Sequence, residues 1–427
     1  MLLFATLLLQ SDMREISMKL NAIQHALLLS LLPSTSVFAA ALDRSGQSIA
    51  PFLQPGNYFE AGISVLDPDV SGKDTSQNDT GDMANYYYSP NAALKLQATE
   101  HFSIGLIYDQ PYGANAQYSG KNNFVENRPV PFKGGTSVTV DTEDLNLILG
   151  YQPNQNWNIY AGAVYQTLNS TVLLRGTSYS AYNGYDFKTG RDEAVGWLVG
   201  VAYQIPEIAL KTSLTYRAKI THEMNAYEKH GAAGMTGSAA FDAALNNINN
   251  TQGNPTEITT PQSVNLDFQT GIMANTVAFA NLRWVNWKDF SIRPYKFGAA
   301  SVLAPVVNKT GKKDGFDLVA YTEDQYSINA GVGRKINDHW AGNVSVGWDS
   351  GAGNPVTTLG PTEGYWNVGV GVQYSPAPNY FIAGGVKYLW LGDAKAQSGS
   401  QFNTSGYVAE FEDNNAIAYG FKIGYKF

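Results

Sequence analysis

The sequence contains no cysteine, which excludes a disulfide scaffold and any metal site built from thiolates. The common signatures of catalysis are lacking too. His222, Glu223, Glu228 and His230 lie near one another but do not have the His-Glu-x-x-His spacing of a zinc enzyme. A Gly-x-Ser-x-Gly nucleophile motif is missing, and the glycine-rich stretch 231–237 has no strand-turn-helix frame to bind phosphate. We therefore predict no metal, no cofactor and no enzymatic activity.

An excess of positive charge is also lacking. The 427 residues include 28 lysines and arginines against 36 aspartates and glutamates, which gives a formal net charge of -8. This balance argues against nucleic acid as a partner. Glycine and tyrosine are abundant instead, with 42 and 26 copies, which suits strands that carry small residues on one face and aromatic girdles at their ends.

Long hydrophobic runs are scarce as well. Beyond residue 39, no segment approaches the roughly 20 apolar residues that a helix needs to cross a bilayer. Two classes remain for the mature chain, a soluble periplasmic protein and a transmembrane barrel. A closed barrel crosses hydrocarbon without long apolar runs, because each strand pairs its backbone with its neighbours.

The N-terminus carries the pattern of an export signal. A charged start at Lys19 precedes an apolar core over 26–32, and Val37-Phe38-Ala39 fits the small-x-small rule of a cleavage site. We predict a signal peptide over 1–39; a buried helix is the alternative. The next segment, 40–57, is rich in glycine and proline turns and too polar to span a membrane, so we predict that it lines the lumen as a short hatch.

The last stretch of the chain has the alternation of a β-strand, in which successive side chains leave opposite faces. One face is continuously apolar and the other is small or cationic. The apolar face carries Ile417, Tyr419, Phe421, Ile423, Tyr425 and Phe427. A chain that ends on phenylalanine after such a run resembles the C-terminal signal of Gram-negative outer-membrane barrels. We therefore predict that Phe421, Tyr425 and Phe427 form the signal that the barrel assembly machinery reads.

Similar alternating segments recur over 58–427, and we count about 14 strands. Turns of a few residues alternate with longer loops, which is the pattern of up-and-down barrels whose short turns face the periplasm. The predicted fold class is all-β, a transmembrane antiparallel β-barrel; a soluble β-sandwich is the alternative. The longest predicted loops are 223–255, with a small helix at 239–248, and 292–315.

Prolines interrupt the second and third predicted strands. Pro90 cannot donate to a ladder, which predicts a bulge or a gap in pairing. The third strand, 102–109, runs into Gln110-Pro111-Tyr112-Gly113, which predicts a kink at Pro111 and Gly113. The fourth strand is predicted over 145–151.

Three arginines are candidate ligand-binding residues. Arg217 is opposite in phase to Tyr216, and Arg283 is opposite in phase to Trp284, so both are predicted to point into the lumen. Arg175 follows the long fifth strand where it meets its loop. Guanidinium groups hold carboxylates through charge-assisted hydrogen bonds. The alternative is that each arginine binds a neighbouring lumenal aspartate or glutamate.

The order of short motifs resembles the long-chain fatty acid transporter family of Gram-negative outer membranes, the FadL type, from about Tyr58 to Phe427. The shared motifs are, in order, Ala61-Gly62, Leu66-Asp67-Pro68-Asp69-Val70, Pro90-Asn91, Tyr112-Gly113, Asp144-Leu145-Asn146-Leu147, Leu214-Thr215-Tyr216-Arg217, Trp287 and the closing Phe-x-Ile-x-Tyr-x-Phe. The family hatch carries Asn-Pro-Ala, which the segment 40–57 lacks.

The resemblance implies a barrel with an N-terminal hatch and an inward kink of the third strand that opens a gap in the wall. Hydrophobic ligands would bind from an extracellular groove and leave sideways through that gap into the membrane. Gly113 matches the kink glycine, and Arg175 matches the arginine near the ligand carboxylate.

The resulting hypothesis is a passive channel in the outer membrane of a Gram-negative bacterium. Its ligand would be a long-chain fatty acid or another hydrophobic molecule, and its other partners would be outer-membrane lipid and lipopolysaccharide. An aromatic hydrocarbon channel of the same fold and a polar-solute porin are the alternatives.

Overall fold

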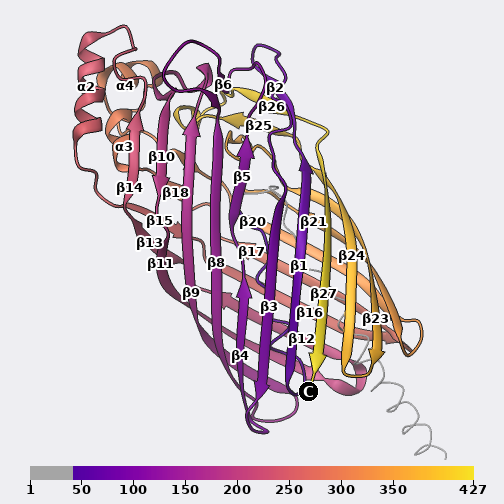
Figure 1. The fold of residues 1–427 in the computed structure, drawn as a ribbon. Coiled ribbons are helices and arrows are strands. Elements are labelled where there is room, and N and C mark those ends of the chain that lie inside the picture. The colour runs from indigo at the N-terminus through magenta and orange to yellow at the C-terminus, as the bar shows by residue number, and fades with distance from the viewer. Residues whose placement is uncertain (1–41) are drawn as a thin grey trace, which may run out of the picture.

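The computed structural model describes residues 42–427, so the predicted signal peptide lies outside the described residues. The chain forms a closed antiparallel barrel of 14 wall strands (Figure 1). The first seven wall strands are β1 (Tyr58–Asp69), β3 (Tyr87–Gln97), β4 (Phe102–Asp109) continued by β5 (Gly113–Gln117), β8 (Ser137–Tyr151), β9 (Trp157–Leu174), β11 (Asp192–Ile205) and β12 (Leu210–Arg217). The other seven are β16 (Ser263–Met273), β17 (Thr276–Val285), β20 (Gln325–Lys335), β21 (Trp340–Asp349), β23 (Tyr365–Ala377), β24 (Tyr380–Leu391) and β27 (Asn415–Lys426).

The barrel closes where the last strand meets the first. β27 pairs with β1 in an unbroken antiparallel register from Tyr58 opposite Lys426 to Asp69 opposite Asn415. On its other side, β1 pairs with β3, and β27 pairs with β24. This arrangement confirms the predicted fold class, because every wall strand then has neighbours for its backbone groups.

The closing strand has the predicted orientation. Tyr419 and Phe421 keep 48% and 51% of their surface exposed on the outside, whereas Ala418 and Lys422 are buried on the inside. The outward residues of the other wall strands are likewise large and apolar, as in Leu147 and Val370. An outer surface of this composition suits hydrocarbon, and the inner surface is small or polar.

Along β8 and β9 the inward and outward positions stay in phase, but the apolar residues change from the outer face to the inner face. In β8, the outward side chains from Leu145 to Tyr151 are apolar, but nearer the start of the strand Thr139 and Asp141 point outward while Val138 and Val140 are buried. The predicted fourth strand, 145–151, was therefore too short, because the sequence pattern inverts at its start. The upper part of the barrel has an apolar interior and a polar outer surface, as expected of a wall that projects from the membrane into water.

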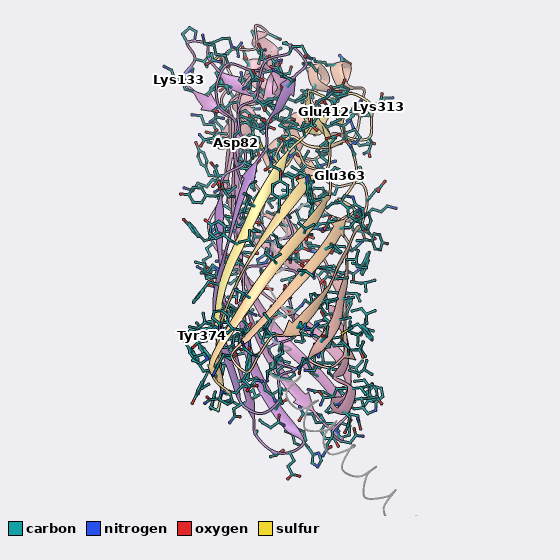
Figure 2. The ribbon with its side chains drawn as sticks, turned by 90° about the vertical axis from the view of Figure 1, so that its right-hand side faces the viewer. Asp82, Lys133, Lys313, Glu363, Tyr374 and Glu412 are labelled. Carbon is teal, nitrogen blue, oxygen red and sulfur yellow. The ribbon has the colours of Figure 1, made fainter. Side chains whose placement is uncertain are left out.

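A cap of short elements covers this upper end (Figure 1). Two short strands, β10 (Tyr185–Thr189) and β14 (Ala226–His230), extend the barrel sheet beside β9. The other short strands are β2 (Gly72–Asp74), β6 (Val125–Glu126), β7 (Gly134–Gly135), β13 (Ile220–Met224), β15 (Thr256–Thr260), β18 (Ser291–Ile292), β19 (Val319–Ala320), β22 (Val356–Thr357), β25 (Ala394–Gln397) and β26 (Ala409–Phe411). Figure 2 places Lys133, Lys313 and Glu412 at this end and Tyr374 near the opposite end.

Three α-helices belong to the cap: α2 (Ala239–Asn250), α3 (Tyr295–Ser301) and α4 (Ala304–Thr310). The predicted helix at 239–248 is α2, and Ser238 caps it by accepting a hydrogen bond from the backbone of Phe241. The prediction of a plain loop over 292–315 was wrong, although the proline near the start of α4 is a helix-start signal. Between residues 42 and 427, no helix is long and apolar enough to cross a membrane.

The two zones of β8 make a testable prediction. Leu147→Lys puts a charge on the apolar outer band, whereas Thr139→Lys puts the same charge on the same face of the same strand above that band. We expect Leu147→Lys to lower the free energy of unfolding in lipid vesicles by about 2 kcal/mol or more and Thr139→Lys by less than about 1 kcal/mol. Denaturant titration in vesicles measures both values, and equal losses would contradict the assigned membrane level.

Candidate functional site

The wall is interrupted at its third strand. The ladder between β3 and β4 ends at Ala92 opposite Tyr108, and β5 then pairs with β8 from Gly113 opposite Asp141 onward. Above the interruption, an isolated bridge joins Ala84 to Ala116. We call the interval between residues 87–91 and 109–114 the wall gap. The kink predicted at Pro111 and Gly113 lies at this gap.

Pro90 borders the wall gap on β3. The register between β1 and β3 runs through Ile63 opposite Pro90 without a shift, so the predicted bulge is not present there. Pro90 lies beyond the end of the ladder with β4. A residue without an N–H is tolerated where the strand lacks a partner on one side, so the proline marks the gap in pairing rather than a bulge.

The N-terminal segment, residues 42–57, reaches the wall gap from inside the barrel. The backbone N–H of Arg44 donates to the carbonyl of Pro111 (2.7 Å), and the N–H of Gly113 donates to the carbonyl of Leu42 (2.8 Å). Asp43 forms an antiparallel bridge with Tyr112. Residues 42–44 thus act as a short extra strand along the kink, which gives partners to backbone groups that the wall leaves unpaired.

The Arg44 side chain lies directly against Gly113. A Cβ atom on Gly113 would overlap the guanidinium group, so only glycine allows this approach. The guanidinium carbon lies 4.1 Å from the ring centroid of Tyr87, and Nη1 lies 3.7 Å from Oδ1 of Asp141. Nε and Nη2 are buried and make no hydrogen bond with any residue that the structure describes. Leaving such donors unmet costs about 1–3 kcal/mol.

The two lumenal arginines bind the N-terminal segment. Arg283 donates from Nε to Oδ2 of Asp43 (2.7 Å) and from Nη2 to Oε1 of Gln47 (3.1 Å). Arg217 donates to the carbonyl of Gln47 (3.0 Å) and to Oδ1 of Asn146 (2.9 Å). Removing one partner from a buried ion pair such as Asp43–Arg283 costs about 3–5 kcal/mol, so this pair is a strong anchor for the segment.

Arg175 lies elsewhere, in the upper part of the barrel. Its Nη2 donates to Oδ1 of Asp186 (2.6 Å), and its Nη1 donates to the carbonyls of Leu174 and Tyr185. The structure therefore brings Arg217 and Arg283 together at Gln47 but keeps Arg175 apart from them. A role for these three arginines in ligand binding stays a prediction.

Below the wall gap, the N-terminal segment closes the lumen with apolar side chains. Ile49, Phe52 and Leu53 are buried in one cluster with Ile148 and Tyr160 of the wall. The Phe52 ring packs edge-on against Tyr160, with 5.7 Å between centroids, and also fills the space beside two inward-facing glycines of the wall. This layer separates the upper lumen from the end that carries the short turns.

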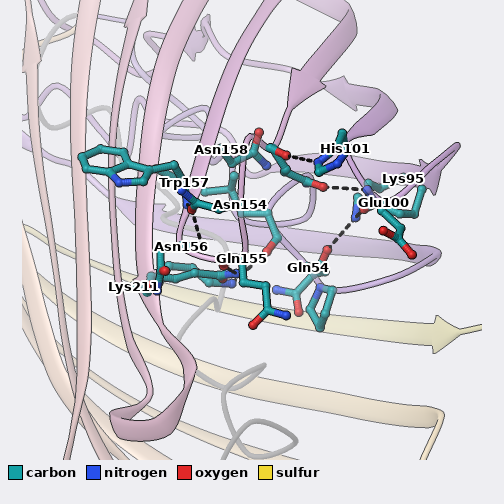
Figure 3. A pocket seen from close by; sticks show the side chains of 16 residues that line it. Gln54, Lys95, Glu100, His101, Asn154, Gln155, Asn156, Trp157, Asn158 and Lys211 are labelled. Atoms are coloured by element: carbon teal, nitrogen blue, oxygen red, sulfur yellow. Dashed lines mark hydrogen bonds between the residues drawn. The ribbon is translucent and has the colours of Figure 1, made fainter.

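A polar pocket lies at the short-turn end (Figure 3). Its volume is about 520 Å³, and asparagine, glutamine and lysine side chains dominate its lining. Lys95 donates to the carbonyl of Gln54 (3.0 Å), and Lys211 donates to the carbonyl of Leu53 (2.8 Å). These contacts fix the last part of the N-terminal segment.

Above the wall gap, two apolar cavities follow one another. The upper cavity lies among Leu174, Tyr179, Tyr182, Phe297, Phe316 and neighbours, and the lower among Leu42, Ala114, Val140, Phe187 and neighbours. Leu318 and Leu359 line both cavities. Each holds only about 20 Å³, roughly the space of one water molecule, so a larger ligand requires these side chains to move. We call the two cavities the apolar track.

Tyrosines in the upper cavity are neutral. Burial raises the pKa of Tyr179 to about 12, so its phenol is protonated at physiological pH. Its hydroxyl donates to Oγ1 of Thr358 (3.0 Å), which satisfies the polar end of the ring. The cavity therefore presents aromatic faces without a net charge.

A sequence profile of the family described as outer membrane protein transport protein (OMPP1/FadL/TodX) matches residues 48–427. The chain belongs to this family. Its members are transport channels of the outer membrane, so the chain is an outer-membrane transport protein and not an enzyme. A search of curated protein sequences finds no match.

Solved structures share the fold at low sequence identity. A FadL homologue from Pseudomonas aeruginosa has a TM-score of 0.66 and 14% identity, over 88% of this chain and 92% of that chain. The toluene transporter TodX from P. putida has a TM-score of 0.58 and 12% identity, over 87% and 90%. The toluene transporter TbuX from Ralstonia pickettii has a TM-score of 0.54 and 13% identity, over 91% and 95%.

Sequence reasoning missed the contribution of the N-terminal segment to this site. It placed 40–57 in the lumen but assigned no role to Asp43 or Arg44. The adjacent acid and base were a usable signal, because charged residues in a lumen-lining segment need charged partners on the wall. The identity of those partners depends on long-range packing that no local pattern encodes.

The apolar layer predicts a change in leak. Phe52→Ala removes the ring that fills the lumen, so we expect a higher single-channel conductance in planar bilayers than the wild type has. Phe102→Ala is the matched control, since Phe102 is an exposed aromatic residue on the outside of the barrel. Unchanged conductance in Phe52→Ala would contradict the view that this segment seals the lumen.

Proposed function

We propose that this protein takes up hydrophobic molecules by passive diffusion, with long-chain fatty acids as its first candidate ligand. The ligand enters at the cap, follows the apolar track and leaves sideways through the wall gap at Pro111 and Gly113. One observation carries the proposal. The apolar track ends beside the wall gap, at Leu42 and Ala114, while the layer around Phe52 closes the lumen below.

The energetics of an alkyl chain favour this sideways exit. Each methylene group moved from an apolar environment into water costs about 0.8 kcal/mol. An alkyl chain that continued toward the polar pocket would lose this free energy along its whole length. An alkyl chain that passes through the wall gap enters membrane hydrocarbon instead and stays out of water.

One of the lumenal arginines, Arg283, could bind the carboxylate of a ligand by exchange. Arg283 already holds the carboxylate of Asp43, so a fatty-acid carboxylate that reached Arg283 would replace one anion by another. The exchange would release the N-terminal segment from its strongest anchor. Arg217 and Gln47 would move with it, since they share the same contacts.

Aromatic hydrocarbons are the second candidate ligands. They are favoured by the aromatic lining of the upper cavity and by the fold likeness to two toluene transporters. A polar-solute porin requires an open, water-filled constriction, and the layer around Phe52 argues against one. Lipopolysaccharide and the barrel assembly machinery remain predicted partners, the latter through Phe421, Tyr425 and Phe427.

Mass spectrometry of lipids extracted from the purified barrel tests the ligand class. Co-purified fatty acid supports the first candidate. Uptake is also measured in cells that carry this protein as their only such channel. Saturable uptake of toluene without uptake of oleic acid would contradict fatty acids as the ligand and support aromatic hydrocarbons.

Filling the wall gap should reduce transport. Gly113→Val places a branched side chain in the gap, so we expect fatty-acid uptake to fall at unchanged surface abundance. Gly190→Val is the matched control, because a Cβ on Gly190 meets no atom within 4 Å. Normal uptake of radiolabelled oleic acid by Gly113→Val would count against the lateral route.

A further inference from the structure

Arg44 occupies a chemically unusual position. Its side chain is 6% exposed, yet two of its donor atoms, Nε and Nη2, have no hydrogen-bond partner among the described residues. These two atoms lie on the same edge of the guanidinium plane. That edge is one of the two forks through which arginine binds both oxygens of a carboxylate side by side.

The rest of the guanidinium group is already engaged. Tyr87 covers one face of the plane, and Nη1 lies near Asp141 on the outer side of β8. The backbone of Arg44 is fixed by its hydrogen bond to Pro111. The side chain is therefore held at the wall gap, and one edge of its guanidinium group has no hydrogen-bond partner among the described residues.

The height of Arg44 along the barrel matches a membrane surface. Gly113, which Arg44 touches, pairs with Asp141, and the apolar outer band of β8 begins only at Leu145. A fatty acid whose tail has entered the outer leaflet keeps its carboxylate at this level, because a charged group avoids hydrocarbon. Nε and Nη2 are the donors that such a carboxylate would meet.

We propose that Arg44 is a specificity-determining residue that binds the carboxylate of an acidic, long-chain ligand at the wall gap. This role rests on the proposed lateral route. The tail passes into the membrane while the carboxylate forms paired hydrogen bonds with Nε and Nη2 of Arg44. Neutral hydrophobic molecules pass the same gap without this contact, so Arg44 separates acids from neutral ligands of equal length.

The test compares oleic acid with oleyl alcohol, which has the same tail and no carboxylate. Initial rates of uptake are measured at limiting ligand concentration in cells whose only long-chain channel is this protein, with folded protein in the outer membrane matched by immunoblot. We expect Arg44→Gln to lower the rate for oleic acid by about 10-fold or more and to leave the rate for oleyl alcohol unchanged. Arg44→Lys keeps the charge without the fork and should fall between Arg44→Gln and wild type.

Two further variants keep the test decisive. Arg334→Gln removes an exposed arginine near the short-turn end of β20, and it should change neither rate. Asp141→Asn removes the nearest competing anion at an exposed site, so it should raise the rate for oleic acid alone even if Arg44→Gln fails to fold.

The outcomes separate this inference from the proposed function. Wild-type protein that carries neither ligand would overturn the proposed function itself. Wild-type protein that carries both, with acid and alcohol affected alike by Arg44→Gln and Asp141→Asn, would overturn only the role of Arg44 and leave the channel intact. Transport of the alcohol but not the acid by wild type would also overturn it.

Discussion

Backbone pairing is the constraint on which the rest of this structure depends. Buried backbone groups have no water to hydrogen-bond, so a wall can leave its ladder only where something else supplies the missing partners. Here the third wall strand leaves the ladder after Asp109, and the carbonyl of Leu42 and the N–H of Arg44 pair with the kink. The N-terminal segment and the wall gap are therefore one structural unit.

The N-terminal segment and the wall gap also determine which routes through the barrel are closed. Asp43 and Gln47 fix the upper part of the N-terminal segment to Arg283, and Phe52 fills the lumen below. A segment of this length is too short for a compact plug, but a single apolar layer is enough to close a narrow lumen. Closure below and an interrupted wall at the side make the lateral direction the one that suits an apolar ligand.

Much of the fold could be predicted from local pattern. The orientation of β27 follows from strict alternation between residues such as Tyr419 and Lys422, and the kink follows from Pro111 and Gly113. The upper half of β8 could not be recovered in the same way, because the apolar residues, such as Val140, face inward there and the polar residues, such as Asp141, face outward. Alternation alone does not say which medium lies outside.

The site was less predictable than the fold. The alternation of side chains along the strands placed Arg217 and Arg283 in the lumen. Their partners on the N-terminal segment, however, are more than a hundred residues away in sequence. Arg44 shows the same limit, since its position depends on a contact with Gly113 and on the height of Asp141. Such contacts arise from closure of the barrel, which no short motif describes.

The lateral route is tested most directly by following the ligand itself. A fatty acid with a photoreactive group at the end of its tail is added to cells that carry the protein, and the labelled peptides are identified by mass spectrometry after irradiation. We expect adducts along the apolar track and at the wall gap, within residues 87–91 and 109–114. Adducts concentrated on Lys211 and on the short turn at 152–156, which line the polar pocket, would contradict it.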